Sequence, residues 1–326
     1  MAEVAYDAVV IGIVTFRRVE QLRRTIPEVL AQLASIGNAG TVLIVDNDPA
    51  GTAHSVVAEL NDPRIRYVVE PQPGIAAARN RALDEAEGAQ LLVFIDDDEH
   101  PVAGWLPSLV ERYRDTRPTA VAGRVRSEFE DEPEPWILAG GFFERRSLPS
   151  GTTVVAAASN NLLLDLSQVR QLELRFDEKF GLSGGSDTLF TRQLTQRGGT
   201  IVWCDEAAVI DRVPAARMTR RWVLLRAMRY GNSWSRTSVA LAGPGRRRSM
   251  VVRLQLAGAG AARLAGGGAR WCAGAVGRSR RLRAGGVRTM AKGAGYLAGC
   301  VGYVYVEYAR PEKHADGRAC RAIADF

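Results

Sequence analysis

The sequence contains few cysteines and histidines, and its last third, from residue 212 on, contains almost no acidic residues. The four cysteines, at positions 204, 272, 300 and 320, form no CxxC pair, and the three histidines form no metal-ligand pattern. This spacing argues against a structural zinc site and favours the reduced thiols of a cytosolic protein. No stretch offers about 20 uninterrupted apolar residues, so no transmembrane helix is expected. Residues 1–7 lack the basic segment that begins a signal peptide, so none is expected.

Charge divides the chain into two parts. Residues 1–211 hold 20 Lys and Arg against 32 Asp and Glu, a net charge of −12, whereas residues 212–326 hold 23 against 4, a net charge of +19. No acid lies between Asp211 and Glu307, and nearly all the positive charge is arginine. Such a basic half suits a polyanionic partner, which can be membrane phospholipid, a lipid diphosphate or nucleic acid. We therefore expect a domain boundary near residue 211.

The stretch QLLVFIDDDE, at residues 90–99, organises the rest of the chain. Its unbroken apolar run predicts a strand buried on both faces of a parallel sheet, and four acids follow where that strand ends. Ligands of open α/β sheets bind outside the carboxyl ends of the strands. Adjacent carboxylates repel one another unless a cation offsets their charge, and oxygen ligands suit Mg²⁺ or Mn²⁺. For an acidic run taken alone, the alternative is a solvated loop.

Other segments alternate between strand and helix patterns, which predicts a parallel, doubly wound α/β sheet. Strands are expected at 8–15, 41–45, 65–69, 120–125, 159–164 and 200–203, and helices at 19–35, 53–60, 75–87, 102–115, 187–197 and 219–240. Residues 127–150, rich in Pro, Gly and aromatic residues, read as an irregular loop. The apolar segments 254–277 and 294–306 are broken by Gly or Arg and are expected to form amphipathic helices lying at a surface.

Six motifs occur in a characteristic order along the chain. They are VTFRR at 14–18, VDNDP at 45–49, PGIAAARNRAL at 73–83, FIDDDE at 94–99, NNLLL at 160–164 and GLSGGSDTLF at 181–190. Together they resemble the family 2 inverting glycosyltransferases of GT-A fold, and most of all bacterial exopolysaccharide β-glucosyltransferases of the succinoglycan type. The resemblance covers roughly residues 8–235. It implies a Rossmann-like, mostly parallel sheet flanked by helices, followed by a basic, mainly helical extension.

The resemblance also implies site residues. Asp98 matches the metal-binding carboxylate of the family, which would hold Mg²⁺ or Mn²⁺, and Asp96 and Asp97 would lie near the ribose and diphosphate of the donor. Asp46 matches the aspartate that recognises the base, although a turn-forming Asx residue is the alternative. The remaining residues expected to bind the nucleotide sugar are Thr15, Arg17, Asn47, Gly74 and Arg79.

Asp187 matches the catalytic base of the family, with a helix cap as the alternative role. Two departures from the family pattern are visible. Ser186 stands where the family usually has Glu, and Ile210 stands where many members have a metal-binding His. The next residue, Asp211, is a carboxylate that can replace imidazole for a hard ion.

The basic part supplies the expected acceptor contacts. Arg217 and Arg221, together with Asn161, are predicted to contact the acceptor or the diphosphate. The implied function is transfer of a sugar from a nucleoside diphosphate sugar, with UDP-glucose as a candidate donor, to a lipid-linked glycan of exopolysaccharide biosynthesis. The enzyme would be cytoplasmic and peripheral at the anionic inner face of the cell membrane, with no nucleic-acid partner. The alternatives are a metal-dependent nucleotidyltransferase and a basic nucleic-acid-binding protein.

Overall fold

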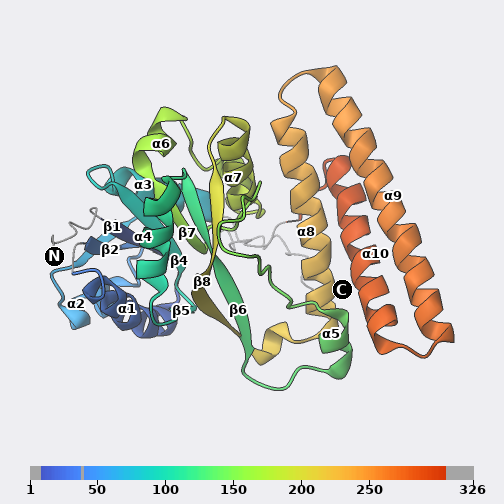
Figure 1. Ribbon diagram of the computed structural model, residues 1–326, viewed down its shortest axis with the longest axis horizontal. Coiled ribbons are helices and arrows are strands. Elements are labelled where there is room, and N and C mark those ends of the chain that lie inside the picture. Colours follow the sequence, from blue (N-terminus) through green and yellow to red (C-terminus); the bar gives the residue numbers. More distant parts are fainter. Residues whose placement is uncertain (1–8, 38–39, 306–326) are drawn as a thin grey trace, which may run out of the picture.

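The computed structural model describes residues 9–37 and 40–305, in which helices cover both faces of an eight-stranded sheet and three long helices stand beside it (Figure 1). The strands are β1 (Val9–Thr15), β2 (Gly40–Asp46), β3 (Ile65–Val69), β4 (Leu91–Asp96), β5 (Glu99–Pro101), β6 (Ala120–Phe129), β7 (Asn161–Asp165) and β8 (Ile201–Val213). The α-helices are α1 (Val19–Ala34), α2 (His54–Leu60), α3 (Ile75–Glu85), α4 (Trp105–Thr116), α5 (Pro135–Gly140), α6 (Leu166–Gln171), α7 (Ser186–Gln196), α8 (Arg220–Leu241), α9 (Arg246–Val276) and α10 (Arg280–Cys300).

The central strands are buried on both faces, as their apolar runs predict. In β4, Leu91 and Val93 belong to a core cluster with α1, α2 and α4, whereas Leu92 and Phe94 belong to a second cluster with α3, α6 and α7. Successive side chains of a strand point to opposite faces, so an unbroken apolar run supplies both clusters. Hydrophobic burial on the two faces therefore fixes the position of β4 in the middle of the sheet.

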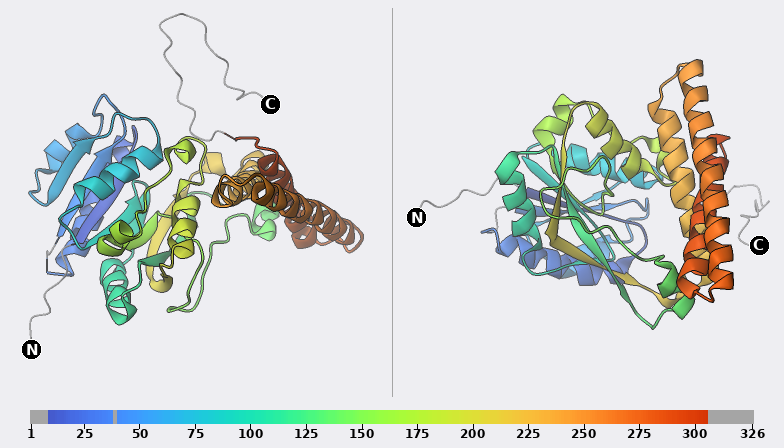
Figure 2. Two further views of the ribbon diagram at one scale, coloured as in Figure 1. Left: turned by 90° about the horizontal axis from the view of Figure 1, so that it is seen from above. Right: turned by 45° about the vertical axis from the view of Figure 1, so that its right-hand side comes forward.

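The sheet is mixed rather than uniformly parallel. Its order is β3-β2-β1-β4-β7-β6-β8-β5. The pairs among β1, β2, β3 and β4 run parallel, as does β6 with β8, whereas β7 runs antiparallel to both β4 and β6. The predicted α/β architecture is confirmed, with β7 as the strand that reverses direction in the middle of the sheet. Figure 2 shows from two further sides how helices cover the faces of this sheet.

Two predicted segments differ from the structure. Residues 127–150 are not wholly irregular, because β6 continues to Phe129 and α5 spans Pro135–Gly140. The predicted strand at 200–203 continues to Val213, passing a register shift against β6 at Gly123 and Arg124. The strands β6 and β8 therefore form one long pair, and the end of β8 brings Asp211 opposite Glu99, just after β4.

The helices α8, α9 and α10 pack closely against one another beside the sheet (Figure 1). At Gly295 of α10, a methyl group would lie 1.9 Å from the carbonyl oxygen of Met228 in α8, and at Gly231 one would lie 2.1 Å from that of Lys292. Only glycine permits such an approach of two backbones. Gly267 of α9 and Gly286 of α10 meet in the same way. The segments expected to lie at a surface are therefore packed backbone to backbone, α9 on α10 and α10 on α8, which explains why glycine interrupts their apolar pattern.

Candidate active site

The ends of several strands meet at one edge of the sheet. Thr15 at the end of β1 lies opposite Asp46 in β2, and Val14 lies opposite Asp96, the last residue of β4. The chain then turns through Asp97 and Asp98 into β5, where Glu99 lies opposite Asp211 of β8. A cavity of about 510 Å³ opens at this edge, bounded also by the start of α7 and one side of α8.

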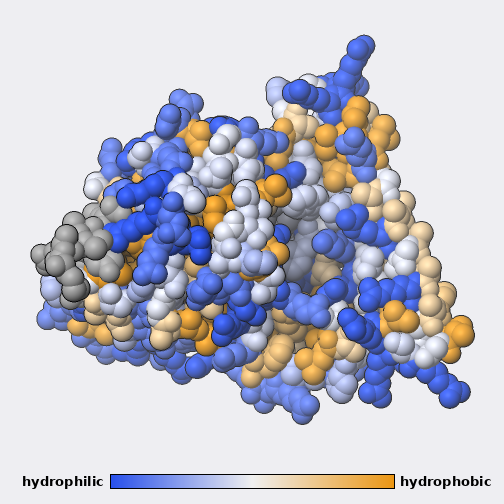
Figure 3. All heavy atoms as spheres, viewed as in Figure 1, coloured by the Kyte–Doolittle hydropathy of each residue, from blue (hydrophilic) through white to orange (hydrophobic). Residues whose placement is uncertain are grey.

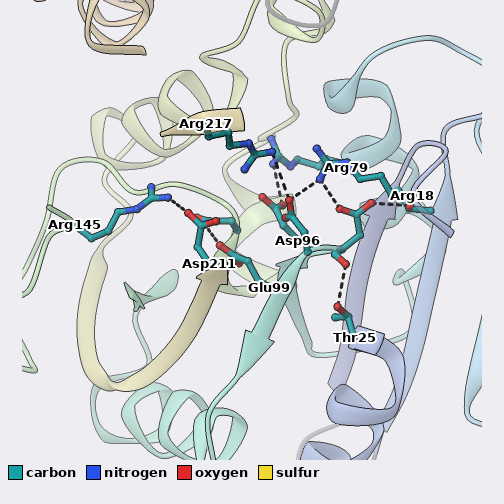
Figure 4. Close-up of polar contacts among 12 residues, drawn as sticks. Arg18, Thr25, Arg79, Asp96, Glu99, Arg145, Asp211 and Arg217 are labelled. Carbon is teal, nitrogen blue, oxygen red and sulfur yellow. Dashed lines mark hydrogen bonds and ion pairs between the residues drawn. The ribbon is translucent and has the colours of Figure 1, made fainter. Parts of the chain in front are cut away.

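Four of the predicted carboxylates line this cavity. They are Asp96, Asp98, Asp187 and Asp211, and Glu99 lines it with them. Asp97 does not, because its buried carboxylate accepts hydrogen bonds from Thr15 at 2.7 Å and from Arg18 at 3.0 Å. Its backbone oxygen accepts another from Thr25 (Figure 4). Thr15 and Asp97 thus bond to each other behind the cavity, so their predicted contacts with the nucleotide have no support in this geometry.

The crowding of these acids shifts their protonation. Burial raises the pKa of Asp96 to about 7; Arg79 opposes the rise and Asp98 adds to it. Burial also raises the pKa of Glu99 well above its usual range, with further contributions from Asp96 and Asp211. The Glu99 Oε2 atom is buried without a hydrogen-bond partner in the described part of the chain. The site therefore favours any cation that can share these carboxylates.

Arginines face the acids across the cavity (Figure 4). Arg79 lies 3.8 Å from Asp96 and 3.5 Å from the hydroxyl of Ser186. Asp98 accepts from Arg18 at 2.8 Å and lies 3.8 Å from Arg217. Guanidinium groups are suited to phosphate oxygens because they donate two parallel hydrogen bonds. The cavity thus presents both carboxylates for a cation and arginines for a diphosphate.

Asp187 lies in the first turn of α7 and lines the cavity. The residue at the cap position is Gly185, and no side chain caps the helix. The carboxylate of Asp187 instead accepts a hydrogen bond from the backbone N–H of Thr188 at 2.7 Å. The cap alternative is therefore wrong in its usual form, although an acid in the first turn still interacts favourably with the helix dipole.

The residues expected around the nucleoside mainly shape their own loops. Asp46 is fully buried and accepts hydrogen bonds from Asp48 N, Ala53 N and Tyr67 Oη at 2.8–3.0 Å. This is the turn-forming role kept as an alternative, and contact with a base stays a prediction. Asn47 accepts a hydrogen bond from the N–H of Gly74, whose φ of +123° suits glycine. Arg17 donates to the carboxylate of Asp48 at 2.8 Å.

The structure places two predicted acceptor residues outside the cavity. The buried Asn161 accepts from the indole N–H of Trp105 and donates to the carbonyls of Arg124 and Ala207. Arg221 is exposed at the start of α8 and does not line the cavity. Asn160 lines it instead and hydrogen-bonds Glu99. The predicted pair Asn160–Asn161 is therefore at the site, but neighbouring side chains alternate in direction along a strand. Asn160 points to the cavity and Asn161 to the core.

Arg226, on the basic helix predicted at 219–240, lines the cavity from α8. Sequence reasoning missed two further arginines there. Arg145, from the loop after α5, is hydrogen-bonded to Asp211. Arg18 was seen only as part of the VTFRR motif. No local pattern distinguishes these arginines from surface ones, because their partners lie between 66 and 80 residues away along the chain.

Comparison with known proteins shows to which family the chain belongs. The sequence matches the Glycosyl transferase family 2 profile over residues 10–164. It is also 33% identical over 229 residues to the succinoglycan biosynthesis protein ExoM of Rhizobium meliloti (strain 1021), covering 69% of this chain and 74% of that protein. The chain belongs to glycosyltransferase family 2. Membership makes it a glycosyltransferase and argues against the nucleotidyltransferase and nucleic-acid-binding alternatives.

Two solved structures support the GT-A fold of this family 2 enzyme. S. aureus TarS 1–349 has a TM-score of 0.51 at 14% identity, over 72% of this chain and 66% of its own. GalNAc-T7, solved with UDP, GalNAc and Mn²⁺, has a TM-score of 0.52 at 14% identity, over 71% of this chain and 48% of its own. This chain thus spans just under two thirds of TarS 1–349 and about half of GalNAc-T7.

The acids of this family 2 enzyme fit a divalent cation. Within residues 9–37 and 40–305, no three His, Cys, Asp or Glu side chains are arranged as a complete metal cage. Mg²⁺ is usually held by one or two carboxylates together with substrate phosphates, so a complete cage is not required. Asp98 and Asp96 supply hard oxygen ligands at the cavity, and Glu99 has an unpartnered buried oxygen. Asp211 is paired with Arg145, so its role as a metal ligand stays a prediction.

The buried Asp97 should make stability depend on pH. Burial raises its pKa to about 6, against about 3.8 for an ordinary aspartate, so the folded protein keeps this proton to a higher pH than the unfolded chain. Stability is therefore lost as pH rises from 4 to 6. Asp97→Asn removes this titration, and the stability of the variant relative to the parent should rise by about 2 to 3 kcal/mol between pH 4 and 7.

Urea unfolding at several pH values, with EDTA present, measures this difference. Asp115→Asn, at an exposed aspartate of α4, gives the background for an aspartate outside the site. A parent-to-variant difference that stays constant from pH 4 to 7 would show that Asp97 does not titrate in this range.

Proposed function

We propose that this family 2 enzyme is an inverting glycosyltransferase that moves a sugar, with glucose from UDP-glucose as the first candidate, to a lipid-linked glycan of exopolysaccharide biosynthesis. The observation that carries the proposal is the cavity in which Asp187, the acids that follow β4 and the arginines of α3 and α8 meet. The similarity to a succinoglycan biosynthesis protein supports the exopolysaccharide context. Residues 1–211 would form the catalytic domain, and residues 212–326 would bind the acceptor and associate with the membrane.

The reaction is a single displacement at the anomeric carbon. The acceptor oxygen forms the new glycosidic bond while the bond from that carbon to the diphosphate oxygen breaks, and this inverts the configuration. Asp187 would take the proton from the acceptor hydroxyl as the new bond forms. Arg79 and Arg217, which face Asp96 and Asp98, would donate hydrogen bonds to the departing diphosphate. A divalent cation held by Asp98 and Asp96 would stabilise charge on the leaving group as a Lewis acid.

A screen of nucleotide sugars tests the proposal. The purified enzyme is incubated with each donor and Mg²⁺ or Mn²⁺, and release of the free nucleoside diphosphate is measured with and without a lipid-diphosphate-linked oligosaccharide. We expect one donor to be used, faster with the acceptor, and NMR of the product to show the anomeric configuration opposite to the donor. Retention of configuration would contradict the inverting mechanism, and no turnover with any nucleotide sugar would contradict the proposed substrate class.

The outer helix α9 supports contact with a membrane surface. Its exposed large apolar side chains include Val251, Leu254, Trp271 and Val276, and hydrophobic residues follow its outer edge in Figure 3. Three exposed arginines, Arg246–Arg248, stand at its start. Apolar side chains beside basic ones are typical of helices that lie at an anionic interface.

None of the helices in residues 9–37 and 40–305 carries an apolar stretch long enough to cross a bilayer.

Replacing Arg246, Arg247 and Arg248 together by Gln should weaken binding to anionic vesicles on the order of a hundredfold, at about 1 kcal/mol for each basic residue near the surface. Sedimentation with vesicles containing phosphatidylglycerol measures the partition at low and at physiological salt. The full chain is used because removal of α9 and α10 would expose the face of α8 that they cover. The matched control replaces the exposed arginines Arg24, Arg170 and Arg197 of the catalytic domain by Gln. Equal losses in both triple variants would refute a specific role for α9.

A further inference from the structure

A second cavity lies beside the catalytic one, and the charged residues that line it are mainly basic. It has a volume of about 420 Å³ and lies between α8, α9, α10 and the loop that follows α5. Four basic side chains line it, namely Arg226, Arg263, Arg288 and Lys292, against one acid, Glu144. Like charges repel one another when they are gathered in one cavity, so this arrangement is most stable when an anion is bound.

The fold holds these cations in place through contacts that leave the cavity charged. Arg263 donates to the carbonyl of Ala259 and lies over the ring of Tyr296, with its guanidinium carbon 4.3 Å from the ring centroid. Arg288 donates to the carbonyl of Gly141 and lies 3.8 Å from Glu144, whose side chain is 75% exposed. Most of these partners are neutral groups, and a carbonyl or an aromatic ring orients a guanidinium without cancelling its charge.

Lys292 is the cation with the least compensation. Lys292 lines the cavity and is exposed at its surface, and among the described residues its ammonium group forms no hydrogen bond or ion pair. Its pKa is lowered by loss of surrounding water and by the neighbouring Arg263 and Arg288. A bound anion would raise the pKa of Lys292 again, because an opposite charge nearby stabilises the protonated ammonium.

The cavity adjoins the proposed site of chemistry. Arg226 and Tyr230 line both cavities, so they form the wall between them. The Nε–H of Arg226 donates to the hydroxyl of Tyr230 at 3.1 Å, which leaves the phenolic hydrogen pointing away from the guanidinium. Thr289 also lines the cavity, but its hydroxyl already donates to the carbonyl of Gly285 at 2.8 Å, so the hydroxyl available to donate is that of Tyr230. Guanidinium, ammonium and hydroxyl donors around a small cavity are the groups that recognise phosphate oxygens.

We propose that the cavity lined by Arg226, Arg263, Arg288 and Lys292 binds a phosphate or diphosphate group, and that the diphosphate of the lipid-linked acceptor is its natural ligand. The second part rests on the proposed function. In this arrangement the donor diphosphate and the acceptor diphosphate occupy different cavities, separated by Arg226 and Tyr230. The acceptor would be anchored by its anionic group while its glycan reaches toward Asp187.

Calorimetric binding of inorganic pyrophosphate to the full chain tests the site without any sugar donor. Lys292→Gln should weaken binding about tenfold, the effect of losing one hydrogen bond to a charged group, and Lys292→Arg should restore most of the affinity. Arg281→Gln, at an exposed arginine of the same helix that lines neither cavity, should leave the affinity unchanged. Equal affinities for the parent and Lys292→Gln would overturn the proposal. So would a loss seen in Arg217→Gln alone, since the anion would then occupy the catalytic cavity.

Vesicles separate the two sources of the anion. Phosphatidylcholine vesicles that contain a polyprenyl diphosphate should bind the parent at least tenfold more tightly than Lys292→Gln, and free pyrophosphate should compete. If pyrophosphate binding depends on Lys292 but vesicle binding does not, the site takes a soluble phosphate and the lipid assignment is overturned. Neither measurement uses sugar transfer, so failure of the transferase assay leaves the anion site standing, and failure of the anion site leaves the transferase proposal standing.

Discussion

Replacing Asp187 by Asn is expected to reduce sugar transfer by about 10²–10⁴-fold, the usual contribution of a general base. Asn has the same shape and can still accept the hydrogen bond from the N–H of Thr188, but it cannot take the acceptor proton. We therefore expect near-parent donor binding and melting temperature. Transfer rates under saturating donor and acceptor, together with thermal unfolding, measure both quantities.

A matched control is available at Asp177, which begins a 3₁₀ helix over Glu178–Phe180 and accepts a hydrogen bond from the N–H of Lys179. Asp177 does not line the catalytic cavity, so Asp177→Asn should leave transfer unchanged. If Asp187→Asn transfers at the parent rate, the base is another of the carboxylates that line the cavity. If Asp187→Asn instead loses stability, the carboxylate serves the helix rather than the reaction.

Replacing Asp98 by Ala is expected to lower metal-dependent donor turnover by about 10³-fold, because a Lewis-acid cation contributes several kcal/mol to stabilising the leaving group. The side chain stands in the turn after β4 and is not part of either core cluster. The fold should therefore survive the change. Calorimetric titration of Mn²⁺ in the presence of UDP should show that the variant binds the cation much more weakly than the parent.

Asp98 also pairs with Arg18 and Arg217. Its replacement by Ala therefore removes the proposed metal ligand and also leaves two arginines without this partner. Arg18→Ala separates these effects. If Asp98 serves mainly to position arginines, Arg18→Ala should impair turnover as strongly as Asp98→Ala while leaving Mn²⁺ affinity unchanged. Parent-like Mn²⁺ affinity in Asp98→Ala would exclude the metal assignment, whatever its effect on turnover.

The position of the acids at one edge of the sheet was predictable from sequence, because the apolar run before them indicates where a buried strand ends. An apolar run such as Leu91–Ile95 must be covered on both faces, and polar residues can follow only where the strand leaves the core. The acids after β4 are therefore found at the edge where β1 and β2 also end. The reversal of β7 was not predictable, because a short buried run is equally suited to either strand direction.

Within the site, the sequence could locate the loops but not the directions of their side chains. Thr15, Asp46, Asp97 and Asn161 lie at the expected strand ends, yet each is at most 4% exposed and bonds to protein atoms. Buried polar groups must be hydrogen-bonded, so residues next to a core are often used to satisfy the backbone and one another. A one-residue difference in strand alternation separates Asn160 at the cavity from Asn161 in the core.

By itself, the sequence determined the α/β class, the edge that carries the acids, the division of charge and the family of this enzyme, because each depends on residue type and order along the chain. Only the tertiary structure decided which acids face the cavity, which arginines oppose them, and how α8, α9 and α10 enclose a second, cationic cavity. Those features depend on contacts between residues up to 147 positions apart, such as Arg288 with Gly141. Such contacts form only when β7, β8 and the glycine-packed helices bring distant segments together, and no local periodicity records them.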